Sequence, residues 1–539
     1  RGGPGPGGGA AAGAEAAGED PWAPGGDPGA QRAHEVEKTS VYKDPRQGAR
    51  LFQAVRSGSS GRELLEAMLH PLSFSDYEGH AHKTPFVLKR PQSPDFWRGL
   101  FSKDLCRRLL ERGEAKYCRD VTVSRVEKSG RRTNLNHNRG GVGGGGGGGK
   151  GGEDEDRRVS AADAWHRFEE EGASVRLLHP QRFPEGRHVL RLLSGLEGLF
   201  DCLVGCNTYL TPRGAQGFRP HYDDIDAFIL QAEGEKRWQL WAPRSETDVN
   251  PLQSSQDFAP ADLGAPDFEV TLRPGDLLYM PRGLIHCAQT PANCDHSLHL
   301  TVSTNQMHSW AHVLEAAFTE ALRQATEKYP ELRETPPLGY MRRLGAMHCD
   351  ARSDERDGLL FLGGHFAKLV LLELGEGSVE GGPSPLDRAA DAINVGFQEQ
   401  RMPPAEGQRR RGAGGESLAM STEAAERALD EDTPLEPAPL GCARLFEEGG
   451  VAHLVHSLAN SEEVHAAEAG GGGGRRLEFD LRHAELLERV LTLRQPTPAS
   501  ELPDSGEDRR EMLIALLEEG LLRPSSGKGA KQTKGAGAA

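Results

Sequence analysis

The chain has 539 residues, of which 36% are hydrophobic and 6% aromatic, and its formal net charge at pH 7 is −16. That charge argues against strong direct binding to nucleic acid, although it is compatible with a local basic patch. No run of 18 consecutive apolar residues occurs, so we expect neither a membrane-spanning helix nor a membrane partner. The 8 cysteines are too sparse for a disulfide scaffold, which favours reduced thiols inside a cell.

Low-complexity segments mark both ends of the chain and one internal insertion. Residues 1–36 are rich in Gly, Ala and Pro, and residues 524–539 form a basic Gly/Ala tail. Both compositions predict disorder, because they cannot bury enough apolar surface to offset the chain entropy. Residues 127–159 contain an unbroken glycine run and then an acidic run, which predicts a flexible insertion.

An ordered region is expected over residues 48–126, before this insertion. Its apolar residues recur at the spacing of helix faces, which predicts helices. The pattern includes Leu64, Leu65, Met68 and Leu69, then Phe96, Trp97, Leu100 and Phe101, and finally Leu105 to Leu110.

Residues 160–305 change to short strand patterns that are separated by turn residues. Many short strands with regular turns predict a double-sheet jelly roll or barrel, the double-stranded β-helix. The turns include Arg273-Pro274-Gly275-Asp276 and Pro281-Arg282-Gly283. The expected strands are Val204 to Tyr209, Ala227 to Gln231, Lys236 to Trp241, Phe268 to Leu272, Leu277 to Met280 and Leu298 to Ser303.

Helical patterns dominate the remainder, so the expected fold class is α+β. Residues 306–416 begin with apolar residues at helical spacing and end in a polar, Gly/Pro-rich stretch over 377–415. Residues 417–523 form a last ordered region. The expected helices lie over 308–374, 484–493 and 509–522.

The most informative motif is the His-x-Asp pair of His221 and Asp223. On a β-strand, residues i and i+2 point to the same face, so the two side chains could bind one ion together. His286 is the best third ligand, because it follows an apolar strand and the turn Pro281-Arg282-Gly283. Two His and one carboxylate form the facial triad typical of non-haem Fe(II) oxygenases, which leaves positions open for a 2-oxo acid and dioxygen.

A His-x-Asp pair alone is weak evidence, since such pairs are more often surface polar stretches. A 2-oxo diacid also needs a basic residue for its far carboxylate. Lys236 is the candidate, because it shares a strand face with Trp238 and Leu240. The competing interpretation of Lys236 is a solvated lysine at a strand end.

Three further histidines need an assignment. His299 lies in an apolar strand, so we expect a satisfied interior histidine near the site and not a ligand. His308 and His312 are spaced i and i+4 and could bind metal on one helix face. Because no third partner is evident for them, we expect surface residues.

Residues from about Asn207 to Asn305 resemble the JmjC oxygenases, and specifically their ribosomal-oxygenase branch of histidyl hydroxylases that are also described as lysine demethylases. The resemblance is weaker over the rest of 160–350 and the C-terminal region. The stretches that carry it are Asn207-Thr208-Tyr209-Leu210-Thr211-Pro212, Gln216-Gly217-Phe218, Pro220-His221-Tyr222-Asp223-Asp224-Ile225, Ala227-Phe228-Ile229-Leu230-Gln231, Pro274-Gly275-Asp276-Leu277-Leu278-Tyr279, Pro281-Arg282-Gly283, Ile285-His286 and His296-Ser297-Leu298-His299-Leu300-Thr301.

This resemblance implies a role for each residue of the site. It implies a JmjC region whose N-terminal part is 48–126 and whose catalytic core is 160–305. It implies that His221, Asp223 and His286 bind Fe(II). It also implies that Lys236 and Tyr209 bind 2-oxoglutarate and that O2 is the oxidant. The resemblance also implies that Asn207 and Ser303 are substrate-contacting positions.

The resemblance also implies substrates, partners and a location. The expected substrate is a histidine of a large-subunit ribosomal protein, and methylated histone lysines in chromatin are the second substrate class, with a role in transcription. A helical dimerisation region over 306–416 implies a homodimer, and 417–523 would be a winged-helix domain. The implied location is the nucleus and nucleolus.

Some features leave alternatives open. The Gly-rich insertions at 140–152 and 470–474 and the stretch 377–415 depart from the family pattern. The helices of 417–523 are acidic, which favours an interaction module over DNA binding. The acidic residues Asp223 to Asp226 would suit a basic peptide, or they are a solvated strand end. A JmjC-like scaffold without turnover, binding chromatin or ribosomal proteins, is the alternative function.

Overall fold

The computed structural model describes most of the chain from residue 47 to residue 525. The expected tail lies outside the described residues from 526 onward, as does the Gly-rich part of the insertion, 139–157. Of the expected disordered segment 1–36, only His34–Val36 is described, and these residues form strand β1, which corrects the boundary. The described ranges are 34–36, 47–57, 59–127, 130–138, 158–376, 382–404, 419–439, 441–462, 464–466 and 473–525.

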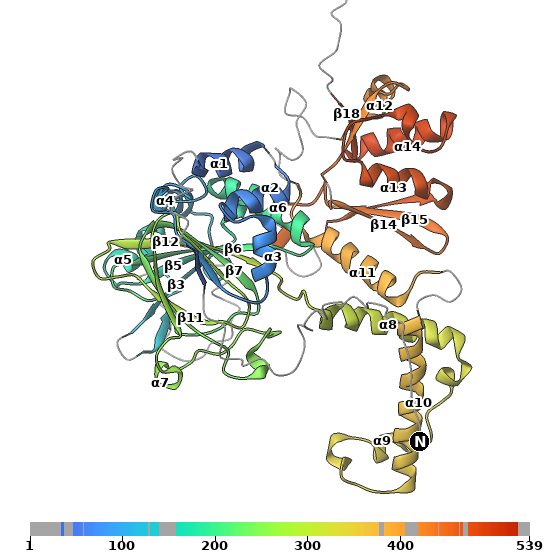
Figure 1. Ribbon diagram of the computed structural model, residues 1–539, viewed down its shortest axis with the longest axis horizontal. Helices are drawn as coiled ribbons and strands as arrows, with labels where there is room; N and C mark the ends of the chain where they lie inside the picture. The colour runs from blue at the N-terminus through green and yellow to red at the C-terminus, as the bar shows by residue number, and fades with distance from the viewer. Residues whose placement is uncertain are drawn as a thin grey trace, which may run out of the picture.

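Two β-sheets form the predicted double-stranded β-helix (Figure 1). The large sheet has the strand order β1-β2-β10-β7-β12-β6-β5-β3-β4, and the small sheet has the order β11-β8-β9. The strands are β2 (Phe86–Leu88), β3 (Val121–Val126), β4 (Arg132–Asn134), β5 (Ser174–Leu178), β6 (Gly205–Pro212), β7 (Asp226–Gly234), β8 (Lys236–Trp241), β9 (Phe268–Leu272), β10 (Leu277–Met280), β11 (Ile285–Gln289) and β12 (His296–Thr304).

All strands expected from the sequence are confirmed, and β8, β9 and β10 have the predicted bounds. Strands β2 to β5 and β11 were not predicted. Alternation of side chains places Ile229 of β7 and Leu278 of β10 opposite Trp238 and Leu240 of β8, and this apolar cluster fills the space between the sheets. The site described below lies beside this cluster.

Helices cover the outer face of the large sheet. A capping box at the N-cap residue Ser60 precedes helix α2, whose buried face is Leu64, Leu65, Met68 and Leu69, as predicted. Phe96 to Phe101 is a series of turns and not the expected helix, although Trp97 is fully buried. The helices of this layer are α1 (Gln47–Ser57), α2 (Gly61–Leu69), α3 (Phe74–His80), α4 (Lys103–Glu111), α5 (Ala161–Glu169) and α6 (Arg187–Phe200).

The expected flexible insertion 127–159 is partly ordered, which corrects that prediction. Arg132–Asn134 pairs antiparallel with β3 and becomes the edge strand β4. Asn136 accepts a hydrogen bond from the Val123 amide at 2.8 Å, which fixes the chain just after this strand.

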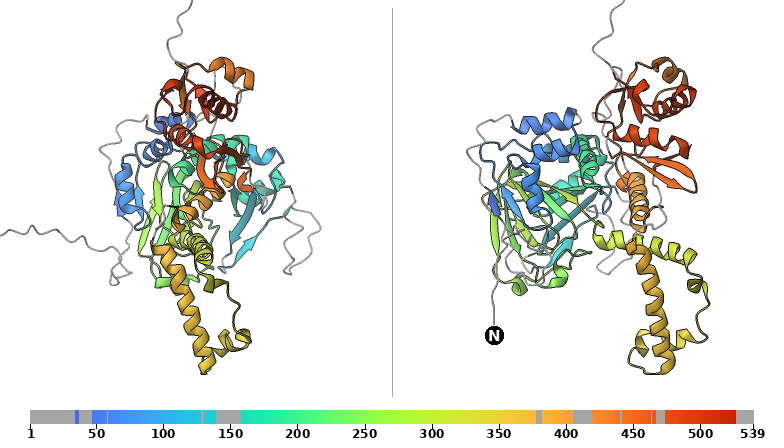
Figure 2. Two further views of the ribbon diagram at one scale, coloured as in Figure 1. Left: turned by 90° about the vertical axis from the view of Figure 1, so that its right-hand side faces the viewer. Right: turned by 45° about the vertical axis from the view of Figure 1, so that its right-hand side comes forward.

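A helical arm follows the jelly roll, as expected. It contains α8 (Trp310–Lys328), α9 (Tyr340–Arg343) and α10 (Asp354–Glu376), and it projects away from the barrel (Figure 2). Helix α11 (Pro385–Gln400) lies inside the stretch expected to be polar and Gly/Pro-rich. Its first turn has a Ser384–Asp387 capping box and Pro385 at the first helical position, both of which favour helix initiation.

Helix α10 differs from expectation in its apolar length. An 18-residue window within Asp354–Gly375 has a mean hydropathy of 1.4, which by length and composition alone is enough to cross a membrane, and no residue of that window is buried within the chain. The sequence predicted a helix here but not its apolar length, because polar residues such as Lys368 and Glu373 interrupt the run of apolar residues.

The C-terminal region 417–523 forms its own apolar core. The expected helices are present as α13 (Ala484–Thr492) and α14 (Gly506–Glu518), and the winged-helix assignment stays a prediction. The remaining elements are α12 (Thr422–Ala428), β13 (Pro434–Pro437), β14 (Ala443–Glu448), β15 (Val451–His456), β16 (Arg475–Asp480), β17 (Thr497–Pro498) and β18 (Leu522–Pro524).

Candidate metal centre

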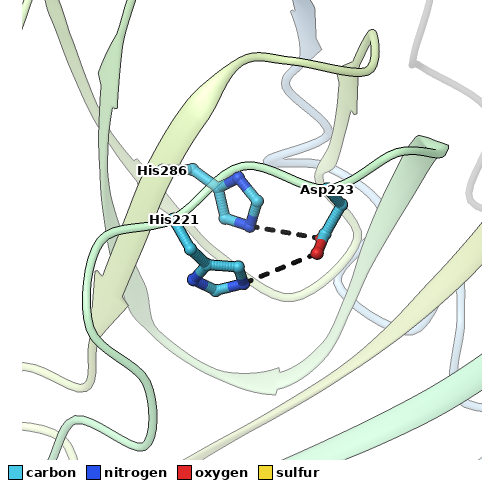
Figure 3. Close-up of side chains that lie close together, drawn as sticks. All are labelled: His221, Asp223 and His286. Atoms are coloured by element: carbon cyan, nitrogen blue, oxygen red, sulfur yellow. Dashed lines mark ion pairs between the residues drawn. The ribbon is translucent and has the colours of Figure 1, made fainter. Parts of the chain in front are cut away.

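The structure brings His221, Asp223 and His286 together inside the jelly roll (Figure 3). His286 lies on β11, and His221 pairs with it in an isolated antiparallel bridge, with N···O distances of 2.8 and 3.2 Å. Asp223 follows in irregular backbone before β7. The expectation that His221 and Asp223 share the face of one regular strand is therefore wrong, because the backbone turns after the bridge and brings the carboxylate between the two imidazoles.

The spacing of the three side chains suits one metal ion. The Asp223 carboxylate oxygens lie 3.7 Å from His221 Nε2 and 3.7 Å from His286 Nε2, and one ligand atom from each residue lies within 4.8 Å of the others. An ion with ligand bonds of about 2 Å fits between atoms so spaced. No other group of three or more His, Cys, Asp or Glu residues has such spacing in the part of the chain that the structure describes.

Hydrogen bonds select the imidazole form that binds metals. His221 Nδ1 lies 2.7 Å from the Arg219 carbonyl, and His286 Nδ1 lies 3.0 Å from the Leu284 carbonyl. A carbonyl only accepts, so each Nδ1 carries the proton and each Nε2 presents a lone pair toward Asp223. Burial, with His221 beside it, lowers the pKa of His286 to about 4, which keeps this ring neutral at physiological pH.

The turn before β11 holds Asp223 in place. The Gly283 amide donates to the Asp223 carbonyl at 3.0 Å. Gly283 has φ +85°, and a Cβ at this position would lie 2.3 Å from the Asp248 carbonyl oxygen. The sequence interpretation of Pro281-Arg282-Gly283 as the turn that directs His286 inward is consistent with this geometry.

A cavity of about 260 Å³ opens beside the three side chains. It is lined by polar and aromatic groups from both sheets, including the unpredicted Arg176 of β5. All residues that the sequence analysis assigned to the site line it: Asn207, Tyr209, His221, Asp223, Lys236, His286 and Ser303.

Lys236 is the buried cation of this cavity. Its side chain is 3% exposed, and Nζ donates to Thr211 Oγ1 at 2.8 Å. Burial lowers its pKa to about 7, and no carboxylate among the described residues forms an ion pair with it. The alternative of a solvated lysine is therefore wrong. Thr211 was missed, because its role depends on the neighbouring strand and not on a local motif.

His299 is an interior residue, as expected, but its buried Nδ1 has no hydrogen-bond partner among the described residues, so the expectation of a satisfied histidine is not met. Its ring stacks on Tyr209 at 4.8 Å with an interplanar angle of 6°, and it meets Trp238 edge-on at 5.4 Å. His312 Nδ1 lies 2.7 Å from Ser309 Oγ, and neither His308 nor His312 belongs to a metal-type group in the described chain.

The acidic residues after His221 divide into two environments. Asp224 lines the cavity and is held by Ser254 Oγ at 2.6 Å and Gln306 Nε2 at 3.2 Å. Asp226 is fully buried at the start of β7. The expectation of one continuous acidic surface thus applies to Asp224 and not to Asp226.

Known proteins are similar to this chain. Residues 176–312 match the JmjC domain. The chain is 32% identical over 468 residues to the bifunctional lysine-specific demethylase and histidyl-hydroxylase NO66 of Aedes aegypti, covering 86% of this chain and 67% of the relative. It is 32% identical over 481 residues to human ribosomal oxygenase 1, covering 88% of this chain and 69% of the relative. The Escherichia coli ribosomal oxygenase YcfD, in a complex with cobalt and 2-oxoglutarate, aligns with a TM-score of 0.39 and 17% identity, covering 84% of this chain and 98% of that one.

Proposed function

Since the chain belongs to the JmjC ribosomal oxygenase family, we propose that it is an Fe(II)- and 2-oxoglutarate-dependent protein oxygenase whose metal is held by His221, Asp223 and His286. The observation that carries the proposal is the meeting of two imidazoles and one carboxylate beside a cavity. Bound Fe(II) with 2-oxoglutarate and O2 supplies the oxidation of a C–H bond, with succinate and CO2 as co-products.

The cavity walls support this use. Lys236 would bind the far carboxylate of 2-oxoglutarate, because it is a buried cation without an anionic partner in the described chain. Tyr209 would contribute a hydroxyl, since it lines the cavity beside His299. Trp238, 4% exposed, limits the access of water to the same space.

The proposed substrate is a histidine side chain of a large-subunit ribosomal protein, and methylated histone lysines are the second class. The names of the relatives contain both activities. Asn207 of β6 and Ser303 of β12 would contact the substrate, since both line the cavity on neighbouring strands. Asp224 would favour a basic peptide segment at the entrance.

Mass spectrometry of the peptide product tests this proposal. With Fe(II), 2-oxoglutarate and O2, the full chain should add about 16 Da, one oxygen atom, to a histidine of a ribosomal peptide, with matching succinate release. His221→Ala should abolish both products. A loss of about 14 Da per methyl group from a methyl-lysine peptide would instead assign demethylation. Peptide binding without any turnover by the unmodified chain would reject the oxygenase and leave the scaffold alternative.

A homodimer located in the nucleus and nucleolus completes the proposal. Exposed apolar side chains on α8 and α10, including Trp310 (71% exposed) and Phe361 (81% exposed), support a second copy as the partner of the helical arm.

The basic composition of residues 524–539 supports the proposed location in the nucleus and nucleolus. Imaging of the full chain with Lys528, Lys531 and Lys534 replaced by Ala tests this location.

A further inference from the structure

A buried carboxylate lies just outside the metal centre and contacts the turn that leads to His286. Asp226 is 0% exposed and follows Asp223 by three residues. Its Oδ1 accepts from the Arg282 amide at 3.0 Å. Its Oδ2 accepts from the Tyr279 hydroxyl at 3.1 Å and from Asn305 Nδ2 at 3.1 Å. A buried charge is tolerated only where donors surround it in this way.

A histidine from the N-terminal helical layer completes the group. His82 Nδ1 lies 2.6 Å from Asp226 Oδ2, and the His82 amide donates to the Tyr279 hydroxyl at 2.9 Å. Burial acts to raise the pKa of Asp226, but the hydrogen bond and charge of His82, together with Arg282, outweigh it and lower that pKa, so the carboxylate is ionised.

Asp226 and Asp223 both accept hydrogen bonds from the same turn, which supplies two consecutive backbone amides. The Arg282 amide donates to the Asp226 side chain, and the Gly283 amide donates to the Asp223 carbonyl. The same turn leads into β11 and His286. The position of this turn therefore sets the separation between Asp223 and His286, and Asp226 is the buried anchor of the turn.

We propose that Asp226 is a positioning residue of the metal centre, which acts through the Arg282–Gly283 turn to set the geometry of Asp223 and His286. The inference rests on the proposed function, because it assumes that these side chains bind a metal. It makes Asp226 different from an ordinary buried aspartate: its loss should alter metal binding and not only folding stability.

The chain offers a matched control at the other end of β10. Asp276 is also buried, at 3% exposed, and it accepts backbone hydrogen bonds from Arg90 at 2.8 Å and Arg273 at 2.9 Å. It precedes β10, whereas Tyr279 near the end of that strand contacts Asp226. Asp276 does not line the cavity.

Co(II) titration of the full chain, followed by visible absorption, distinguishes a positioning role of Asp226 from a role in folding stability alone. Asp226→Asn should weaken Co(II) binding by about 10-fold or more and change the cobalt absorption spectrum. Asp276→Asn should keep both at the unmodified values, although each variant should lower the unfolding temperature of the metal-free chain. Unmodified affinity and spectrum in folded Asp226→Asn would overturn the inference.

A second variant covers the case in which Asp226→Asn does not fold. His82 has a 51% exposed side chain, so His82→Ala should fold while removing the shortest contact to Asp226. It should weaken Co(II) binding in the same direction by a smaller factor, and unchanged affinity and spectrum would overturn the inference. Absence of Co(II) binding by the unmodified chain, or unchanged binding by His221→Ala, would instead reject the metal centre itself.

Discussion

Lys236 shows at the scale of one residue what the cavity is suited to hold. A buried ammonium without an anionic partner is unfavourable, and burial lowers the pKa of Lys236 to about 7. A dicarboxylate that enters the cavity would restore the charge pair and raise that pKa again. Binding and protonation of Lys236 are therefore linked.

We predict that the affinity for 2-oxoglutarate falls as the pH rises above about 7, because the ligand requires the protonated form that the free protein loses there. Calorimetry in buffers of different ionisation enthalpy should also show proton uptake on binding at about pH 8. Lys236→Arg, which stays charged, should bind more weakly but with little pH dependence. An affinity of the unmodified chain that is constant between about pH 6 and pH 9 would contradict this role.

The sequence could identify several residues that line the cavity, but it missed Arg176 and did not predict how the residues are arranged. His221, Asp223, His286 and Lys236 belong to local motifs, so pattern and resemblance were enough to select them. Asp226 was grouped with Asp224 as an acidic patch. Its function as an anchor depends on His82, Tyr279 and Asn305, which are distant in sequence, and no local pattern reports such contacts.

At the scale of elements, the helices and strands with the clearest periodic pattern of apolar residues were predicted best. Strands β8 to β10 are bounded by turn residues, and their limits were predicted. Strand β4 has the polar sequence Arg-Thr-Asn, so only its pairing with β3 makes it a strand. Helix α11 was hidden by the Gly/Pro content of its flanks, although its capping box at Ser384 was a usable signal.

We predict that Gly283→Ala weakens the turn that carries His286. The new Cβ would meet the Asp248 carbonyl at 2.3 Å in a backbone with φ +85°, so we expect a loss of about 2–4 kcal/mol in the free energy of unfolding and weaker metal binding. Gly214→Ala is the matched control, because φ is +66° but no atom lies within 4 Å of the new Cβ; it should cost about 1 kcal/mol and leave metal binding unchanged. Chemical denaturation of both variants checks this, and equal losses would contradict it.

At the scale of the whole molecule, the helical arm is the part that does not bury its own apolar surface. Leu360 (50% exposed) and Phe361 (81%) lie near one end of α10, and Leu371 (50%) and Leu372 (45%) near the other. A helix with apolar residues on several faces is covered by protein or by lipid. Helix α8 covers only part of α10 (Figure 1). A second arm of the same kind would cover the rest.

We predict that the chain is a dimer in solution and that Phe361→Glu combined with Leu372→Glu makes it monomeric, because both substitutions place charge in the contact. Light scattering checks the mass, and circular dichroism should show that the helices remain. Arg98→Glu, at an exposed position far along the chain from the arm, should leave the dimer intact. A monomeric mass for the unmodified chain, with binding to lipid vesicles that the double variant loses, would instead indicate a membrane contact for α10.

The most direct test of the account is an anaerobic titration of the Fe(II)-loaded chain with 2-oxoglutarate, followed by visible absorption. Two imidazoles and one carboxylate leave room for a chelating 2-oxo acid, so one equivalent should produce a charge-transfer band that His286→Ala lacks. Fe(II) binding without a band on addition of 2-oxoglutarate, or a band that persists unchanged in His286→Ala, would contradict the proposed metal centre.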